Sequence, residues 1–397
     1  MALSDEGAKA PSAHGRFVNR HYIFIILHSQ PGVILLQIHL DRQALHRIPE
    51  LDRNLPKTTE YIKNALSGLK CQVFSPAEGA LCAFFDFGKP ETIAFRTDMD
   101  ALPITEKTGL PFASGHAGQM HACGHDGHMA MALELARRVN AKEDLPRNVL
   151  LVFQPAEETT GGAKDICDSG VFARYNVTAI FGMHLWPGQK AGEICSRRCE
   201  MMSRSCEVKV DITGKSAHIA KSWEGIDAMA AGVEFYSRVV ALEQSLPKHI
   251  FRLLKFGKLH SGTVGNAVSG YTRLEGSLRA FQDEVFFGLR DGVKAIAKEI
   301  EEKTGCTVQV HMNDGYPAIL NPDELYDRVL QCASFCQLEA PSMITEDFSW
   351  YQRSVPGVFF FLGTGDTPAL HADTFDFDEE ILLKGAAFFE NLAENLP

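Results

Sequence analysis

The chain has 397 residues, of which 45% are hydrophobic and 22% are charged. This composition is ordinary for a globular protein and excludes intrinsic disorder as the main state. Asp and Glu number 50 against 39 Lys and Arg, which gives a net charge of −11. A protein this acidic, without a long basic run, is not expected to bind nucleic acid, because that needs concentrated positive charge.

At about 150 residues per domain, the length predicts two or three domains. Residues 1–38 follow neither helical nor strand periodicity for long, and we treat them as an atypical N-terminal extension. Their apolar stretch, Tyr22 to Ile38, is interrupted at Ser29-Gln30-Pro31-Gly32, so neither piece is long enough to cross a membrane. The stretch also begins too far from Met1 for a signal peptide. The ten cysteines are scattered, which favours reduced thiols and a cytoplasmic location.

After this extension, helices and strands alternate. Helical periodicity or composition predicts helices at 41–47, 57–68, 127–140, 162–172, 323–336 and 379–395. Apolar runs predict strands at 91–97, 148–153, 178–183 and 358–362. The run Asn148–Phe153 (NVLLVF) is apolar throughout, which is typical of a strand buried on both faces. The alternation predicts an α/β domain with a largely parallel sheet and helices on both sides.

The pattern changes at about Ser203. Strands are expected at 206–212, 253–259, 271–281 and 307–312, with long helices at 226–242 and 285–303. These elements make a compact α+β unit. We therefore expect a discontinuous catalytic domain, residues 39–202 and 314–397, with a second domain inserted at 203–313.

The densest group of reactive side chains is Met120-His121-Ala122-Cys123-Gly124-His125-Asp126-Gly127-His128. Cys123 and His125 are one residue apart, so both can point the same way in an extended segment. Thiolate and imidazole are ligands suited to zinc and its neighbours in the transition series. A polar loop with a chance cysteine is the alternative explanation for this segment alone.

Four further segments place similar residues near the ends of strands. Glu157 and Glu158 follow one buried strand, His184 follows another, and His371 comes eight residues after a glycine at the end of a third. Asp98 ends the strand at 91–97. Ligands of open α/β sheets gather at the carboxyl ends of strands, so we expect these side chains to meet. Five candidate ligands are too many for one tetrahedral ion with an open position and instead suit two ions sharing a bridge.

In this order, the segments RTDMDALP, MHACGHDGH, FQPAEE, GMHLWP and GKSAH, with a late Gly-x-Gly…His, resemble the amidohydrolase branch of the M20 metallopeptidase family. This branch includes aminoacylases, hippurate hydrolases and N-acetyl-diaminopimelate deacetylases. The resemblance spans about residues 40–396. It implies a zinc-peptidase-like catalytic domain, two divalent ions (Zn, Mn, Co or Ni) and an inserted lid domain through which two chains form a homodimer.

The resemblance also implies the metal ligands. Cys123 resembles the ligand that bridges the two ions. His125 and His184 resemble ligands of one ion, and Glu158 and His371 resemble ligands of the other.

Further roles follow from the same resemblance. Glu157 resembles the general base that takes a proton from the attacking water. Asp98 is similar to a carboxylate that orients a ligand histidine. His218, in GKSAH, resembles a residue that reaches the developing oxyanion from the partner subunit. Asn266 and Arg279 resemble lid positions that hold the substrate's carboxylate or carbonyl.

The expected reaction is hydrolysis of an N-acyl amino acid to a carboxylate and a free amino acid. An N-acetyl-diaminopimelate-type deacetylase or a dipeptidase is the alternative among enzymes, and a metal-binding module without catalysis is the alternative outside them. The intact Glu157 favours an enzyme, because a module that only binds metal has no need of a base. One departure concerns Ile219–Glu224, where the family usually has small residues and a Pro-His pair, so the substrate contacts of this loop are open.

Overall fold

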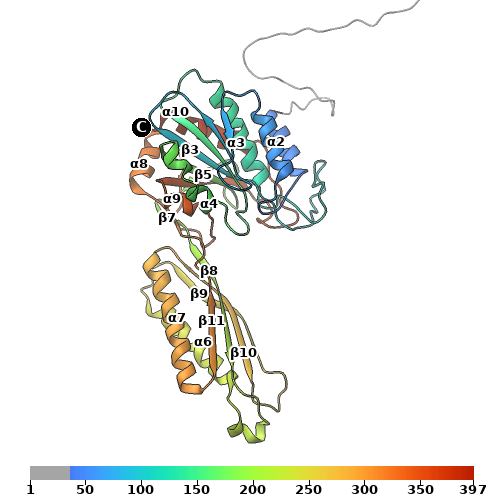
Figure 1. Cartoon of the computed structure of the whole chain (residues 1–397), viewed down its shortest axis with the longest axis vertical. Helices are drawn as coiled ribbons and strands as arrows, with labels where there is room; N and C mark the ends of the chain where they lie inside the picture. The colour runs from blue at the N-terminus through green and yellow to red at the C-terminus, as the bar shows by residue number, and fades with distance from the viewer. Residues whose placement is uncertain (1–35) are drawn as a thin grey trace, which may run out of the picture.

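The computed structural model describes residues 36–397. It shows a broad domain with a large sheet and an elongated second domain that projects from it (Figure 1). Most of the extension expected at 1–38 lies outside the described residues. Gln37 and Ile38, which we had assigned to it, belong to helix α1 (Gln37–His46), and Ile38 is fully buried in the core.

The larger domain is built on an eight-stranded mixed sheet with the order β1-β2-β4-β3-β5-β14-β6-β13. Its four central strands, β4, β3, β5 and β14, run parallel, as expected, and antiparallel pairs occur only toward the two edges. The α/β fold class is therefore confirmed. The strands are β1 (Gln72–Phe74), β2 (Leu81–Phe85), β3 (Thr92–Asp98), β4 (Asn148–Gln154), β5 (Val177–Pro187), β6 (Ile194–Ser196), β13 (Cys336–Gln337) and β14 (Gly357–Gly365).

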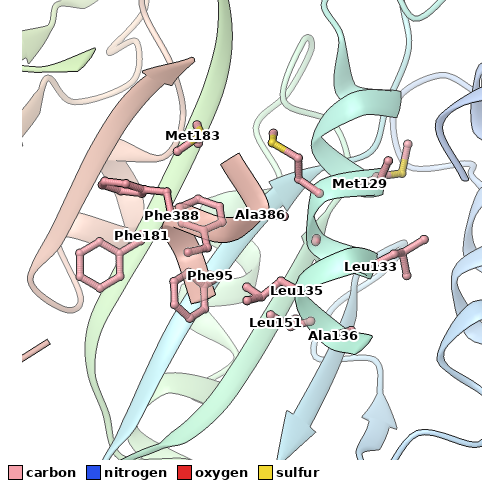
Figure 2. Packing of buried hydrophobic residues seen from close by; sticks show 14 of the residues in the cluster. Phe95, Met129, Leu133, Leu135, Ala136, Leu151, Phe181, Met183, Ala386 and Phe388 are labelled. Carbon is pink, nitrogen blue, oxygen red and sulfur yellow. The ribbon is translucent and has the colours of Figure 1, made fainter. Parts of the chain in front are cut away.

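Helices cover both faces of this sheet, which explains the unbroken apolar runs. Successive strand residues point to opposite faces; Leu150 packs into the core on one side of β4 and Leu151 into the core on the other. One face carries α1, α2 (Pro56–Leu66), α3 (His125–Asn140), α8 (Asp323–Cys332) and α10 (Ile381–Asn395). The other carries α4 (Ala163–Asp168), α5 (Val171–Arg174) and α9 (Ser349–Gln352). Figure 2 shows Leu135 of α3 and Phe388 of α10 in the first core.

Two helices differ from the sequence prediction. The helix expected at 162–172 is divided into α4 and α5, because Gly170 adopts a left-handed backbone with φ 74°. The helix expected at 323–336 ends at Cys332, and Cys336 instead pairs with the sheet in β13. Here the chain leaves the helix so that the ring of Phe335 packs edge-on against Phe360 in the core, with centroids 5.4 Å apart.

The inserted unit is a four-stranded antiparallel sheet, order β11-β8-β10-β9, with two helices on one face. Alternate residues of β8 are buried, as in a sheet with one exposed face. Its elements are β8 (Arg204–Thr213), η1 (Ile219–Glu224), α6 (Ala228–Ser245), β9 (Arg252–Ser261), β10 (Tyr271–Ala280), α7 (Asp283–Thr304) and β11 (Thr307–Met312). Where the two domains join, β7 (Cys199–Met202) pairs with β12 (Ile319–Asn321). We call 204–312 the lid.

Within residues 36–397, no helix combines the length and the apolar run that a membrane crossing requires.

Candidate dinuclear metal centre

The five predicted metal ligands come from four elements of the catalytic domain and lie together in space. Cys123 and His125 stand at the start of α3, Glu158 follows β4, His184 lies near the end of β5, and His371 follows β14. Since β4, β5 and β14 belong to the parallel part of the sheet, their carboxyl ends meet at one edge. His184 lies within β5 rather than after it, because this strand continues to Pro187.

Unusual backbone conformations place three of these segments. Gly124, between Cys123 and His125, has φ 83°, and a Cβ atom there would lie 2.7 Å from Leu185 Cδ1. His371 (φ 66°) and Ala156 (φ 60°), which precedes the two glutamates, are also left-handed although neither is glycine. Such positions cost about 1–3 kcal/mol each and cluster at functional sites.

The donor atoms of the five residues are close to one another. Cys123 Sγ lies 3.4 Å from Nε2 of both His184 and His371. Glu158 Oε1 lies 3.3 Å from His371 Nε2 and 3.8 Å from His125 Nε2. The sulfur thus lies close to one histidine of each predicted pair, as the predicted bridging position requires.

Hydrogen bonds fix the tautomers of the two buried histidines. His125 Nδ1 lies 2.7 Å from the Asp100 carbonyl oxygen, and His184 Nδ1 lies 2.7 Å from that of Leu185. A carbonyl only accepts, so each Nδ1 carries the proton and each Nε2 presents a lone pair to the cluster. Burial lowers the pKa of His184 to about 3, which keeps this imidazole in the neutral form that a metal ligand needs.

Asp98 makes a different contact from the one expected. Its Oδ1 lies 2.7 Å from His128 Nδ1, whereas its Oδ2 lies 3.7 Å from Nε2 of the predicted ligand His125, beyond hydrogen-bond distance. The backbone N–H of Leu185 donates to His128 Nε2 over 2.9 Å, so the proton of His128 sits on Nδ1 and is donated to Asp98. Asp98 therefore fixes His128, a residue to which the sequence had assigned no role.

Asp100 is a second residue whose role the sequence did not reveal. Its two carboxylate oxygens accept hydrogen bonds from the backbone N–H groups of Glu157 and Glu158, over 3.0 and 3.1 Å. It thereby holds the turn that presents both glutamates. The available signal was its place in Asp98-Met99-Asp100, directly after the buried strand β3.

The carboxylates around the centre outnumber the cations. Arg96 is buried and pairs with Asp98, Glu346 and Asp347 at 2.9–3.0 Å. Burial and the neighbouring Asp347 raise the pKa of Glu346 to about 8, although Arg96 acts in the opposite direction. Burial, Glu346 and Glu158 raise the pKa of Glu157 well above its ordinary value. A carboxyl group whose pKa is strongly raised, in a cleft beside other metal-binding side chains, is a candidate for a functional role.

Two observations support a fit between these residues and metal ions. His125 Nε2 and Glu158 Oε1 are buried atoms without a hydrogen-bond partner in the structure. Such orphaned acceptors are rare in folded proteins and need a partner of positive character. The excess of buried carboxylates needs the same compensation. Burial raises the pKa of Glu158, but His371 and His125 outweigh it and lower the pKa to about 2, which keeps Glu158 in its ligating form.

A cavity of about 820 Å³ opens beside the centre, between the catalytic domain and the lid. Cys123, Glu157, Glu158, His184 and His371 line its floor. From the lid, β10 contributes Arg279, whose guanidinium donates to the Met343 carbonyl oxygen. Apolar side chains at the wall are Trp186, Met202, Ile344 and Leu370.

Two predicted site residues lie elsewhere. β8 begins near the catalytic domain and ends at Thr213 at the far end of the lid (Figure 1). His218 and Asn266 lie beyond that end; the Asn266 carbonyl accepts from the Ile219 N–H. Both side chains are exposed, and neither lines the cavity of its own chain.

The fold and the centre define a two-domain, metal-dependent hydrolase. Among solved structures, the chain resembles a dinuclear metal-binding peptidase of the M20 family from Bacillus subtilis, with a TM-score of 0.77, 29% identity, and coverage of 90% of this chain and 96% of the other. An aminobenzoyl-glutamate utilization protein from Klebsiella pneumoniae shares the fold, with a TM-score of 0.61, 18% identity, and coverage of 90% and 95%.

The sequence comparisons agree. A protein of Staphylococcus epidermidis described as an uncharacterized hydrolase is 32% identical over 373 residues, 90% of this chain and 97% of its own. The model of peptidase family M20/M25/M40 matches residues 94–395. The chain belongs to this family, which confirms the resemblance drawn from the sequence motifs.

Proposed function

We propose that the protein hydrolyses the amide bond of N-acyl amino acids, releasing a carboxylate and a free amino acid. The observation that carries this proposal is the position of Glu157, which stands beside five convergent predicted metal ligands and lines the same cavity as Arg279. A base, a metal centre and a cation for the substrate's carboxylate are the three parts that the reaction needs.

When bound, the two ions would supply a water of lowered pKa and would polarise the amide carbonyl. Cys123, His125, His184, Glu158 and His371 would hold them. Glu157 would take the proton of the attacking water and pass it to the leaving nitrogen, a role worth about 10²–10⁴-fold in rate. Its raised pKa fits a group that must both accept and return a proton.

The lining of the cavity supports an acylated amino acid as the substrate. Arg279 is placed to pair with the α-carboxylate, since guanidinium binds carboxylates in a bidentate manner. Trp186 and Leu370 offer apolar surface for the acyl group. The cavity volume of about 820 Å³ is in the ordinary range for small-molecule sites and leaves the size of the acyl group open.

We infer that the protein acts as a homodimer, in which His218 and Asn266 serve the partner's centre. The exposed side chains Met229, Val233 and Tyr236 recur at helical spacing along α6. β9 is an edge strand of the lid sheet, a ready surface for pairing with a second copy. We place the enzyme in the cytoplasm, which suits its ten free cysteines.

Amine release from a panel of N-acetyl, N-benzoyl and longer N-acyl amino acids tests the activity. The panel includes an acylated diaminopimelate and dipeptides, and the chelated protein is refilled separately with Mn, Zn or Co. Metal-restored turnover on N-acyl amino acids supports the proposal, whereas turnover on dipeptides alone overturns it. Glu157→Gln should keep its metals and lose about 10²–10⁴-fold in kcat; the exposed Glu339→Gln serves as its control.

A mixing experiment tests the role of His218 across the dimer. The Glu157→Gln and His218→Ala substitutions should each inactivate the enzyme. The two variant proteins are then mixed, unfolded together and refolded. If His218 acts on the partner, the mixed dimer contains one intact centre, and activity returns. If it acts within its own chain, every centre lacks one of the two groups, and the mixture stays inactive.

A further inference from the structure

A second group of metal-binding side chains lies outside the catalytic cavity. Cys195 is in β6, Cys336 is in β13, and Glu193 immediately precedes β6. β6 and β13 pair in parallel with Cys195 directly opposite Cys336, so both side chains leave the sheet on the same side. One sulfur or oxygen atom from each of the three residues lies within 4.8 Å of the others.

The distances suit a tetrahedral ion. Cys195 Sγ lies 3.9 Å from Glu193 Oε2 and 3.8 Å from Gln189 Oε1. With metal–sulfur bonds of about 2.3 Å and metal–oxygen bonds of about 2.0–2.2 Å, tetrahedral donors stand roughly 3.5–3.8 Å apart. The two contacts of Cys195 are therefore close to tetrahedral spacing, and Cys336 lies within 4.8 Å of both other residues. Cys195 is fully buried, but Cys336 and Glu193 are partly exposed, so an ion can enter from solvent.

We propose that Glu193, Cys195 and Cys336 bind a single zinc-like divalent ion, with Gln189 Oε1 or a water as the fourth ligand. Two thiolates and one carboxylate are soft to borderline donors, which favour Zn²⁺ over Mg²⁺ or Ca²⁺. Binding forms two metal–sulfur bonds and releases the two thiol protons to solvent. None of the four residues lines the catalytic cavity, so this ion is separate from the dinuclear centre.

The carboxylate distinguishes this site from a redox pair of cysteines. Glu193 Oε2 lies 3.9 Å from Cys195 Sγ, so an anionic oxygen donor stands beside the two thiols, which a disulfide does not need. A divalent ion would compensate the charges of Glu193 and both thiolates together.

The place of the site in the fold gives the ion a structural role. β6 leads through β7 to Ser203, at the entrance of the lid, and β13 leads to Ser342. The Ser203 N–H donates to the Ser342 carbonyl over 3.1 Å, so the two chain segments that leave the site meet again beside the lid. An ion between Cys195 and Cys336 would join the two-residue strand β13 to the sheet and support this junction.

Metal counting on the full-length protein tests the proposal. The reduced protein is chelated, refilled with excess Zn²⁺ and desalted, and bound zinc per chain is measured by plasma mass spectrometry. Cys336→Ser and Glu193→Gln should each bind about one equivalent less than the wild type and lose its zinc-dependent rise in Tm. Cys332→Ser, four residues away, is the matched control, because Cys332 lies outside the group.

Two results would overturn the proposal. Equal zinc content in Cys336→Ser and in the Cys332→Ser control would show that the group binds no ion. Formation of a Cys195–Cys336 disulfide at the same rate in zinc-filled and chelated protein exposed to glutathione disulfide would show that no ion holds the two thiolates. Circular dichroism of the chelated variants checks that the partly exposed substitutions leave the fold intact. Substitution of the fully buried Cys195 is avoided for this reason.

Discussion

Replacing Asp98 with Asn tests the hydrogen-bonded support beneath the metal centre. Asp98 is fully buried; its Oδ2 accepts from Arg96 over 2.9 Å and its Oδ1 accepts from His128 over 2.7 Å. Both partners donate, so the position requires two acceptors. Asn has the same shape but offers one acceptor and one NH₂ donor.

Neither orientation of the Asn side chain satisfies both neighbours. With its NH₂ toward Arg96, two donors face each other. With its NH₂ toward His128, the imidazole would have to move its proton to Nε2, where the Leu185 N–H already donates over 2.9 Å. Breaking a buried ion pair costs about 3–5 kcal/mol, and leaving a buried donor unsatisfied costs about 1–3 kcal/mol. These two costs overlap, so we expect Asp98→Asn to lower the free energy of unfolding by about 4 kcal/mol.

Urea unfolding in the presence of a chelator measures this loss without a contribution from bound metal. The expected result is a lower transition midpoint with an unchanged m-value. Asp366→Asn, the same chemical change at an exposed position, should alter the free energy of unfolding by less than about 0.5 kcal/mol. A loss below about 1 kcal/mol for Asp98→Asn would refute the tautomer assigned to His128.

Three further substitutions probe separate features. Burial lowers the pKa of His46, but Asp126 and Glu106 outweigh burial and raise it to about 9. Protonated His46 therefore stabilises the folded state fully below pH 6.5, and this stabilisation is lost as the pH rises through 9. At about 1.4 kcal/mol per pH unit, it amounts to at most about 3 kcal/mol. In His46→Gln, the urea midpoint should no longer fall between pH 6.5 and 9 for this reason. If the midpoints of the variant and the wild type fall in parallel with pH, His46 is not the group responsible. Gly162→Ala would place a Cβ atom 2.0 Å from the Pro155 carbonyl oxygen, in the turn that carries Glu157. It should cost about 1–3 kcal/mol and lower kcat, whereas Gly288→Ala, in open space on α7, should be neutral or stabilising; equal effects would exclude the steric explanation. Arg279→Ala should raise KM at least about 10-fold for substrates with a free carboxylate and leave their methyl esters unaffected, with Arg273→Ala on the same strand as control. Equal changes for acids and esters would exclude a carboxylate contact.

The arrangement of the centre could be predicted because several of its predicted ligands lie at or near the carboxyl ends of buried strands. Unbroken apolar runs such as Asn148–Phe153 predict central parallel strands, and the ends of such strands meet at one edge. This rule predicts that Glu158, His184 and His371 lie together, and the density of donors in Cys123-Gly124-His125 adds the other two predicted ligands. The structure agrees with that grouping to within hydrogen-bonding distances.

Other features could not be predicted because they depend on contacts between distant short segments. β13 has two residues, too few for any periodicity, and its pairing depends on Phe335 entering the core. Asp98 contacts His128 rather than a predicted ligand histidine. This contact depends on the first turn of α3, and residue type alone does not reveal it. The positions of His218 and Asn266 depend on how far the lid extends from the catalytic domain. That distance depends on the lengths of the paired lid strands, which the sequence pattern alone does not give.

The buried charges around the centre connect the ligand cluster, which could be predicted, with the supporting contacts, which could not. Asp98, Glu346 and Asp347 share the guanidinium of Arg96, and both carboxylate oxygens of Asp100 accept hydrogen bonds from the Glu157–Glu158 turn. The carboxylates that fix the predicted ligands thus outnumber Arg96 at the edge of the cavity, and a bound divalent cation would compensate the charge they carry. The buried residues that position the predicted metal ligands would therefore also raise the affinity of the centre for divalent cations.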